Sequence, residues 1–281
     1  MILPCLFLVL AGPLLAQDSF DFGELSRMIR SGSVEEKRQA LFEIRNLECE
    51  ECSRLAVPAL ADQSEIVRAT AVSSVIFLPQ TEAVQFLTPL LLDESPFVRS
   101  ETAYALGKIG PGVPSGSLIE ILEKDKFPEA RSAAAVALGK IGDPKAIPGL
   151  TAVLRKKPKS GEEFLRRASA RSIGQIARLL QTGKLQTTTP RDFLPEKFHK
   201  REQPKYRDLI ESFPVFSSAL DALINSLKNP KEFPDVKREA AFALGELGQK
   251  AAVPALTEAL RAKDYYLGRI AENALAKINR D

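Results

Sequence analysis

The phrase Ala-Leu-Gly-Lys-Ile-Gly occurs twice in this chain of 281 residues, at 105–110 and at 137–142. A close variant, Ala-Leu-Gly-Glu-Leu-Gly, follows at 243–248. A phrase that returns at a nearly constant spacing indicates a chain assembled from repeated units, each unable to bury its apolar face alone. Stacked units present an extended surface, so we expect a surface for binding rather than an enclosed catalytic pocket.

The pairs before the repeated phrase give the length of the unit. Val67-Arg68 recurs as Val98-Arg99 and as Ala130-Arg131, at steps of 31 and 32 residues. From Val98 onward the apolar positions 98, 102, 105, 106 and 109 follow helical spacing. The sequence therefore predicts one longer helix in each unit, with small residues that let neighbouring helices approach closely.

A shorter helix is predicted before each longer one. Val57-Pro58, Ile147-Pro148 and Val253-Pro254 have the proline that a first helical turn tolerates. Glycines are predicted to end the longer helices in the left-handed conformation, which costs glycine little. These glycines are Gly110, Gly142 and Gly248. The repeating unit is then helix, turn, helix, turn.

The segment from Ala130 to Leu150 resembles the HEAT repeat family, and within it the bacterial HEAT-like repeats first named from phycobilisome lyase subunits. The resemblance extends over almost the whole chain after residue 16. It implies an all-α fold: a right-handed α-solenoid of about seven helix pairs. It also implies that the second helices line a concave face, used mostly to bind other proteins.

One interruption is predicted in a single solenoid that spans residues 17–281. The unit with Arg166 and the unit with Lys237 are about 71 residues apart, and residues 182–214 between them contain several prolines and scattered aromatics. A connection of this length inside a compact array is usually functional or disordered, and aromatic residues argue against simple disorder. We expect an inserted excursion that folds back over the array, with a short helix around Tyr206 to Ser212.

The first sixteen residues have no charged side chain and are mostly apolar. The run is shorter than the roughly 20 residues that a transmembrane helix needs, and Pro4, Gly12 and Pro13 interrupt it. It is typical of a secretory signal peptide cleaved after Ala16, which predicts an exported, periplasmic or secreted protein with no membrane span after cleavage. An uncleaved anchor or a misassigned start are the alternatives.

Cys49 and Cys52 have the Cys-x-x-Cys spacing. A zinc site would need two further ligands, and the one histidine, His199, is far away in sequence. A thioredoxin-like redox motif would need a βαβ context, which the sequence lacks. A local disulfide or two free thiols remain, and an exported protein favours the disulfide.

Aspartates precede the repeated arginines by six residues: Asp62 before Arg68, Asp93 before Arg99 and Asp125 before Arg131. Such a pattern indicates either a binding stripe or a hydrogen-bonded ladder that sets the turns and links neighbouring units. We favour the ladder, as the resemblance implies, because charge-assisted hydrogen bonds of this kind fix geometry.

A cationic stretch covers residues 155–184, although the net charge of the chain is only +3. Arg167, Arg171 and Arg178 share a face if one helix runs from Glu162 to Leu180. The stretch is either an ordinary solvated helix face or a patch that binds anions such as nucleic acid, acidic polysaccharide, lipid headgroups or an acidic protein. Export would make nucleic acid an unexpected ligand.

Catalytic and cofactor signatures are absent from the sequence. His199 is the only imidazole, and no phosphate-binding glycine loop occurs in a βαβ setting. We therefore predict a non-enzymatic protein without cofactor or metal, which binds a protein or peptide. An anion- or nucleic-acid-binding solenoid and an accessory subunit of a lyase-type enzyme are the alternatives. The residues predicted to contact the partner are Arg131, Arg166, Arg167, Arg171, Phe198, His199, Tyr206, Lys237 and Arg238.

Overall fold

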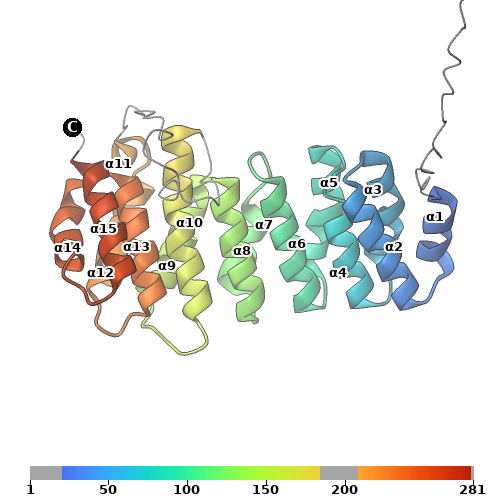
Figure 1. Ribbon diagram of the computed structural model, residues 1–281, viewed down its shortest axis with the longest axis horizontal. Helices are drawn as coiled ribbons and strands as arrows, with labels where there is room; N and C mark the ends of the chain where they lie inside the picture. Colours follow the sequence, from blue (N-terminus) through green and yellow to red (C-terminus); the bar gives the residue numbers. More distant parts are fainter. Residues whose placement is uncertain (1–20, 184–207, 280–281) are drawn as a thin grey trace, which may run out of the picture.

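The computed structural model describes residues 21–183 and 208–279, and these residues form an all-α solenoid, as the sequence predicts (Figure 1). Seven helix pairs follow one another in a row. The second helices of the pairs are α2 (Val34–Leu47), α4 (Glu65–Ser74), α6 (Pro96–Ile109), α8 (Pro128–Ile141), α10 (Glu163–Thr182), α13 (Pro234–Leu247) and α15 (Tyr265–Ile278).

The first helices of the pairs are shorter or broken. They are α1 (Phe22–Ser31), α3 (Glu50–Ala56) with η1 (Val57–Ala61), α5 (Gln80–Leu87) with η2 (Thr88–Leu92), α7 (Gly116–Lys124), η3 (Pro144–Ala146) with α9 (Ile147–Arg155), α12 (Val215–Lys228), and η6 (Lys250–Ala252) with α14 (Val253–Ala259).

Two prolines lie deeper in the first helices than the sequence suggested. Pro58 and Pro89 follow the complete α-helices α3 and α5, and the chain tightens into the 3₁₀ helices η1 and η2 at these prolines. Proline has no N–H for the α-helical hydrogen bond, so a tighter turn replaces the lost one. The prediction of a proline in the first helical turn was therefore wrong for Pro58, and Pro89 has the same position in its unit.

Glycine ends the second helices at the three predicted positions. Gly142 and Gly248 adopt the left-handed conformation. Gly110 differs, with φ 87° and ψ −141°, a region open to glycine alone. The cause is Pro111, because a residue before proline is sterically driven away from helical ψ values.

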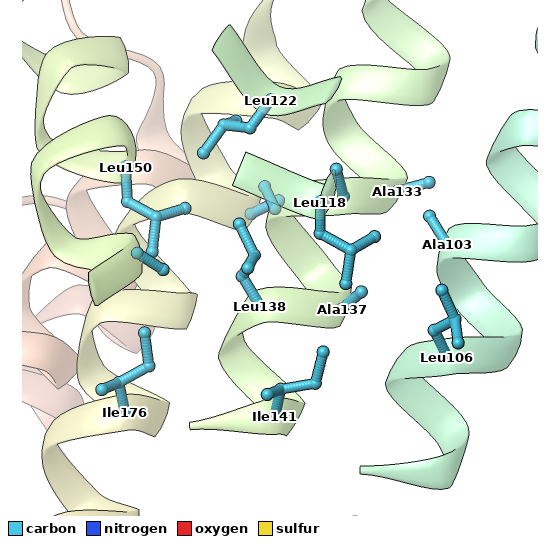
Figure 2. Packing of buried hydrophobic residues seen from close by; sticks show 14 of the residues in the cluster. Ala103, Leu106, Leu118, Leu122, Ala133, Ala137, Leu138, Ile141, Leu150 and Ile176 are labelled. Atoms are coloured by element: carbon cyan, nitrogen blue, oxygen red, sulfur yellow. The ribbon is translucent and has the colours of Figure 1, made fainter. Parts of the chain in front are cut away.

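The second helices pack directly on one another, α4 on α6, α6 on α8, α8 on α10, α10 on α13 and α13 on α15. Figure 2 shows alanines, leucines and isoleucines of α6, α7, α8, α9 and α10 filling the space between two layers of helices. Small residues make this approach possible. A Cβ on Gly107 of α6 would lie 2.7 Å from the Cα of Ala137 of α8, and one on Gly245 of α13 would lie 2.7 Å from the Cβ of Ala274 of α15.

The inserted segment does not interrupt the stack. α10 packs on α13 as closely as α6 packs on α8, although residues 184–207, which the structure does not describe, lie between them in the chain. The chain returns at α11 (Leu209–Ser212), where Leu209 is buried and Asp208 accepts a hydrogen bond from the Gln249 side chain. The expected short helix thus corresponds to α11, while the rest of the proposed excursion lies outside the described residues.

Replacement of Gly107 by alanine tests the helix contact. In an exposed helix this change stabilises by about 1 kcal/mol. Here the added methyl meets the backbone of Ala137, so we expect Gly107→Ala to lower the free energy of unfolding by about 1–3 kcal/mol. Thermal unfolding followed by circular dichroism measures the change.

Gly116 at the start of α7 is the matched control. A Cβ there meets nothing within 4 Å, so Gly116→Ala should leave the melting temperature unchanged or raise it. Equal responses of the two variants would contradict the contact.

Candidate interaction surface

A ladder of ion pairs joins most of the units to the unit that follows. We define the charge ladder by its five rungs: Lys37–Asp62, Arg68–Asp93, Arg99–Asp125, Arg166–Glu232 and Arg238–Asp264. In each rung a base near the start of a second helix meets an acid before the next second helix. The pairing confirms the ladder over a binding stripe as the role of the recurring aspartates.

Arg68 shows how one rung works. Its Nε and Nη2 donate to the two carboxylate oxygens of Asp93, each over 2.8 Å. Its Nη1 donates to the backbone oxygens of Asp62 and Gln63 in its own turn, and so closes that turn. Arg99 repeats this arrangement with Asp125 and with the backbone of Asp93. A planar guanidinium is suited to such a double task.

The aspartates of the ladder are held ionised. Burial disfavours the charged form of Asp93, but hydrogen bonds from Arg68 and from the Ser95 amide outweigh it, so the pKa of Asp93 lies below its ordinary value of 3.8. For Asp125, burial likewise raises the pKa, but hydrogen bonds from Arg99 and from the Phe127 amide outweigh this effect and lower the pKa below its ordinary value. A carboxyl group with a lowered pKa in the folded state stabilises the fold above the unfolded pKa.

Arg99→Ala tests this contribution. Both side chains of the Arg99–Asp125 rung are nearly enclosed, so the variant leaves a buried carboxylate without its partner. We expect the free energy of unfolding at neutral pH to fall by about 3 kcal/mol. The wild type should lose stability as pH falls below 3.8, and the variant should lose less over that range because the pKa of Asp125 is no longer depressed. Urea unfolding at a series of pH values measures both effects.

Arg269→Ala is the control, because the Arg269–Glu272 pair is exposed and lies within one helix. Such a pair contributes at most about 0.5 kcal/mol. If Arg99→Ala were as stable as this control, the rung would have no structural role.

Arg166, predicted to contact a partner, is instead a structural residue. Its side chain is 1% exposed and is paired with the buried Glu232. It also donates to the backbone oxygens of Val153 and Lys156, which closes the long turn between α9 and α10. A side chain enclosed on all sides in this way is not available to a binding partner.

The other arginines of α10 each face an acid of α13. Arg171 donates to Glu239 over 2.8 Å, Arg167 lies 3.5 Å from Asp235, and Arg178 lies 3.4 Å from Glu246. The single helix that the sequence predicted is present, and its arginines do share a face. Their charge is matched along the helix by carboxylates 68 positions further on, so among the described residues of the stretch, 155–183, the unpaired cations are confined to residues 155–159.

Apolar side chains remain exposed along the second helices. We call the solvent-facing side of α4, α6, α8, α10, α13 and α15 the second-helix face. Phe97 of α6 is 49% exposed, Phe164 of α10 is 44% exposed and Tyr266 of α15 is 66% exposed. Each immediately precedes the buried residue that begins the repeated pattern, so an alignment of the units could have identified them. Half-buried Tyr104, Val136 and Phe242 continue the face in the middle of the helices.

An open cavity of about 370 Å³ lies where α10 and α13 begin. Two phenylalanines and three charged side chains line it, with the Arg167 guanidinium 4.9 Å from the centre of the Phe164 ring. The lining residues are Glu163, Phe164, Arg167, Phe233, Pro234 and Asp235. The cavity offers an apolar wall with both charge signs at its rim, which fits a side chain of a protein better than a simple anion.

The remaining predicted contact residues have different surroundings. Arg238, and not Lys237, which aligns with the ladder arginines in sequence, forms the rung with Asp264. Its guanidinium lies 5.3 Å from the ring centre of Tyr266. Lys237 is half-buried. Arg131 is half-buried, and its Nε donates to the Leu122 backbone oxygen. The predicted contacts Phe198, His199 and Tyr206 lie outside the described residues, as does the predicted signal peptide, residues 1–16.

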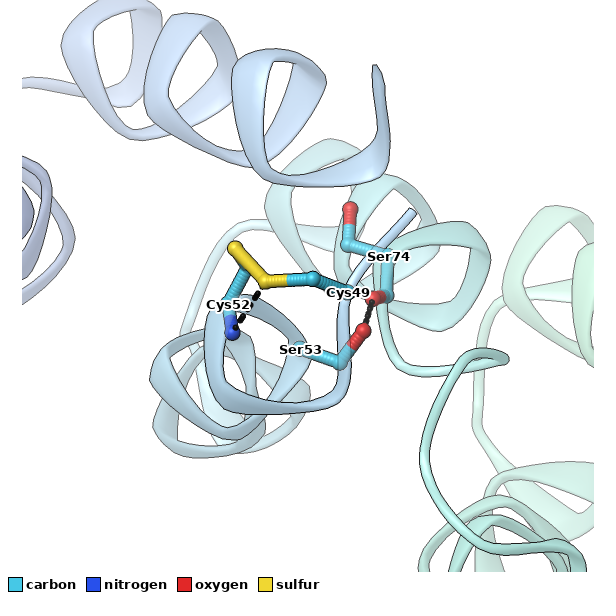
Figure 3. The surroundings of a disulfide bond; sticks show 4 residues. All are labelled: Cys49, Cys52, Ser53 and Ser74. Carbon is cyan, nitrogen blue, oxygen red and sulfur yellow. Dashed lines mark hydrogen bonds between the residues drawn. A yellow bond between two sulfur atoms is a disulfide. The ribbon is translucent and has the colours of Figure 1, made fainter. Parts of the chain in front are cut away.

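Cys49 and Cys52 form a disulfide at the start of α3 (Figure 3). The Cys52 amide donates to the Cys49 sulfur, and the neighbouring Ser53 hydroxyl donates to the Ser74 backbone oxygen of α4. The disulfide therefore lies where the first helix of the second unit, α3, contacts the second helix of that unit, α4. Of the two outcomes that the sequence left, a local disulfide and two free thiols, the structure shows the disulfide.

Within residues 21–183 and 208–279, no group of three or more histidine, cysteine, aspartate or glutamate side chains is placed to hold a metal ion. No helix of this described part is long and apolar enough to cross a membrane.

The sequence matches the profile of a family described as HEAT repeats at residues 53–115, 113–187 and 220–281. A comparison with curated protein sequences finds no match.

Solved structures share the fold at low sequence identity. An engineered protein is 19% identical with a TM-score of 0.56, over 90% of this chain and 67% of the other. The complex of CpcE and CpcF of phycocyanin lyase from Nostoc sp. PCC7120 is 20% identical with a TM-score of 0.49, over 98% and 93%. Computationally designed armadillo repeat proteins for modular peptide recognition are 17% identical with a TM-score of 0.45, over 92% and 100%.

Proposed function

The chain belongs to the HEAT repeat family, and we propose that it is a non-catalytic scaffold that binds a protein or peptide along its second-helix face. The observation that supports this most is the row of exposed apolar side chains on that face, Phe97, Phe164 and Tyr266 among them. Large exposed apolar side chains gathered on one face are characteristic of protein interaction sites.

The charges around these rings also fit a protein partner. Arginines lie over two of them, Arg167 over Phe164 and Arg238 over Tyr266, and both arginines pair with Asp235. The face therefore alternates apolar, basic and acidic groups. A protein surface can match such a mixture, whereas a uniform polyanion cannot.

Replacement of the three exposed rings tests the proposal. Phe97→Ser, Phe164→Ser and Tyr266→Ser combined should abolish capture of the partner from the envelope fraction of the native host, because aromatic anchors dominate interface energies. The protein recovered with wild type is identified by mass spectrometry and its affinity is then measured with purified components.

Val215→Ser is the control, since Val215 is an exposed apolar residue of the first helix α12. The control should bind like wild type, and all variants should keep the wild-type circular dichroism spectrum. Unchanged affinity of the triple variant would show that the second-helix face is not the binding surface.

We also propose export from the cytoplasm. The uncharged apolar segment 1–16 supports it, and the Cys49–Cys52 disulfide is the oxidised state expected of an exported protein. Fractionation of the native host should place the protein outside the cytoplasm, with an N-terminus at Gln17. Thiol alkylation before denaturation should label neither Cys49 nor Cys52. A cytoplasmic protein that retains Met1 would refute the proposal.

A further inference from the structure

The charge ladder is interrupted at one place, Arg131. In the neighbouring rungs an arginine meets the aspartate at the end of the next first helix, Asp93 or Asp125. At the end of α9 this position is occupied by Lys156, whose backbone (φ −68°, ψ 150°) is close to that of Asp125 (φ −62°, ψ 140°). A base therefore stands where the repeat geometry otherwise places a carboxylate.

Arg131 is left with donors to spare. Its Nε donates to the Leu122 backbone oxygen over 2.9 Å, while its Nη1 and Nη2 have no hydrogen-bond partner among the described residues. The carboxylate of Asp125, which belongs to the same unit as Arg131, already accepts hydrogen bonds from Nε and Nη2 of Arg99. Arg131 is half-buried, and neither amino group is among the fully enclosed, unpartnered polar atoms of the described residues.

The surroundings of Arg131 add positive charge. The segments 124–127 and 155–161 contain six bases, Lys124, Lys126, Arg155, Lys156, Lys157 and Lys159, and one acid, Asp125. All six are exposed, and none forms an ion pair with a described residue. The loop between α9 and α10 lies on the same edge of the solenoid as the loop between α12 and α13 (Figure 1). The exposed ring of Phe127 lies in the first of the two segments.

We propose that Arg131, together with Lys156 and Lys157, binds a carboxylate of an acidic segment of the partner protein. That carboxylate accepts two hydrogen bonds from Nη1 and Nη2 of Arg131, because Nε already donates to the Leu122 backbone oxygen. Asp93 and Asp125 accept a comparable pair of hydrogen bonds from Nε and Nη2 of Arg68 and Arg99. The inference rests on the proposed function and deepens it, because it names the chemistry of the partner and a second contact at the edge of the solenoid. We call this contact, formed by Arg131, Lys156 and Lys157, the edge site.

A carboxylate is favoured over a nucleic-acid phosphate by the composition of the site. The chain itself uses carboxylates at the equivalent positions, and the exposed Phe127 beside the cations offers an apolar contact for a peptide. The arginines of α10, which would extend a track for a polyanion, are paired with α13. Within residues 21–183 and 208–279 the unpaired cations of this region are therefore confined to a short stretch, as a peptide segment requires.

Lys156→Asp is the decisive variant, because it completes the missing rung within the chain. The full chain is titrated into a labelled oligo-glutamate peptide, and binding is followed by fluorescence anisotropy. Wild type should bind the peptide, and the variant should bind it with an affinity that is lower by about tenfold or more. The melting temperature of the variant should rise, since the new carboxylate at position 156 would accept hydrogen bonds from Nη1 and Nη2 of Arg131, whose Nε donates to Leu122. Arg131→Gln should weaken peptide binding without this rise.

Lys145→Asp makes the same change in net charge at an exposed site on η3 and should bind the peptide like wild type. An equal loss in this control would reduce the effect to net charge and overturn the proposal. Wild-type binding by Lys156→Asp with no rise in melting temperature would also overturn it. Tighter binding of an oligonucleotide than of oligo-glutamate, lost in the Arg131 and Lys156 variants, would replace the acidic peptide by nucleic acid.

The two proposals can fail separately. If wild type captures its partner through Phe97, Phe164 and Tyr266 but oligo-glutamate does not bind, only the edge site is refuted. If oligo-glutamate binds through Arg131 while the triple aromatic variant still captures the partner, the second-helix face is refuted and the edge site stands.

Discussion

The close contact between successive second helices is the constraint on which the rest of this structure depends. Gly107 and Gly245 lie in the last turns of α6 and α13, inside helices in which glycine costs up to about 1 kcal/mol relative to alanine. They are required because the next helix lies where a Cβ would be. The contact sets the spacing of the units, buries the alanine and leucine rows between them, and leaves the opposite sides of the helices to solvent.

The charge ladder acts on the same stack from its edge. Hydrophobic contacts between alanines tolerate small rotations, whereas a guanidinium that holds a carboxylate and two backbone oxygens does not. Arg68 and Arg99 thereby fix both the turn of their own unit and its position against the next. Arg166 and Glu232 do this across the inserted segment, and Arg171 with Glu239 adds a pair further along the same helices. The array therefore continues through α10 and α13 despite the interruption in the chain.

The close contact between second helices and the charge ladder also determine which groups remain exposed. Most arginines of the second helices are committed to carboxylates of the neighbouring unit. The side chains that we propose for a partner are the rings that precede the repeat pattern in α6, α10 and α15, and the bases near Arg131, where the ladder lacks its acid. The ladder positions that stabilise the stack in the other units are thus the positions that we propose for recognition in the unit of Arg131. There Lys156 stands in place of the aspartate.

The sequence by itself determined the helix pairs, their number, the family and the ladder, because each of these is a periodic pattern of local spacing. It also placed α10 within two residues of its observed bounds. Only the tertiary structure decided which charges are free. The acids that face Arg167, Arg171 and Arg178 lie 68 positions along the chain, beyond the inserted segment, and no local pattern connects them. Whether an arginine is buried, paired or open to a partner depends on what the next unit places against it, as Arg166 and Arg131 show. That contact exists only once the units are stacked.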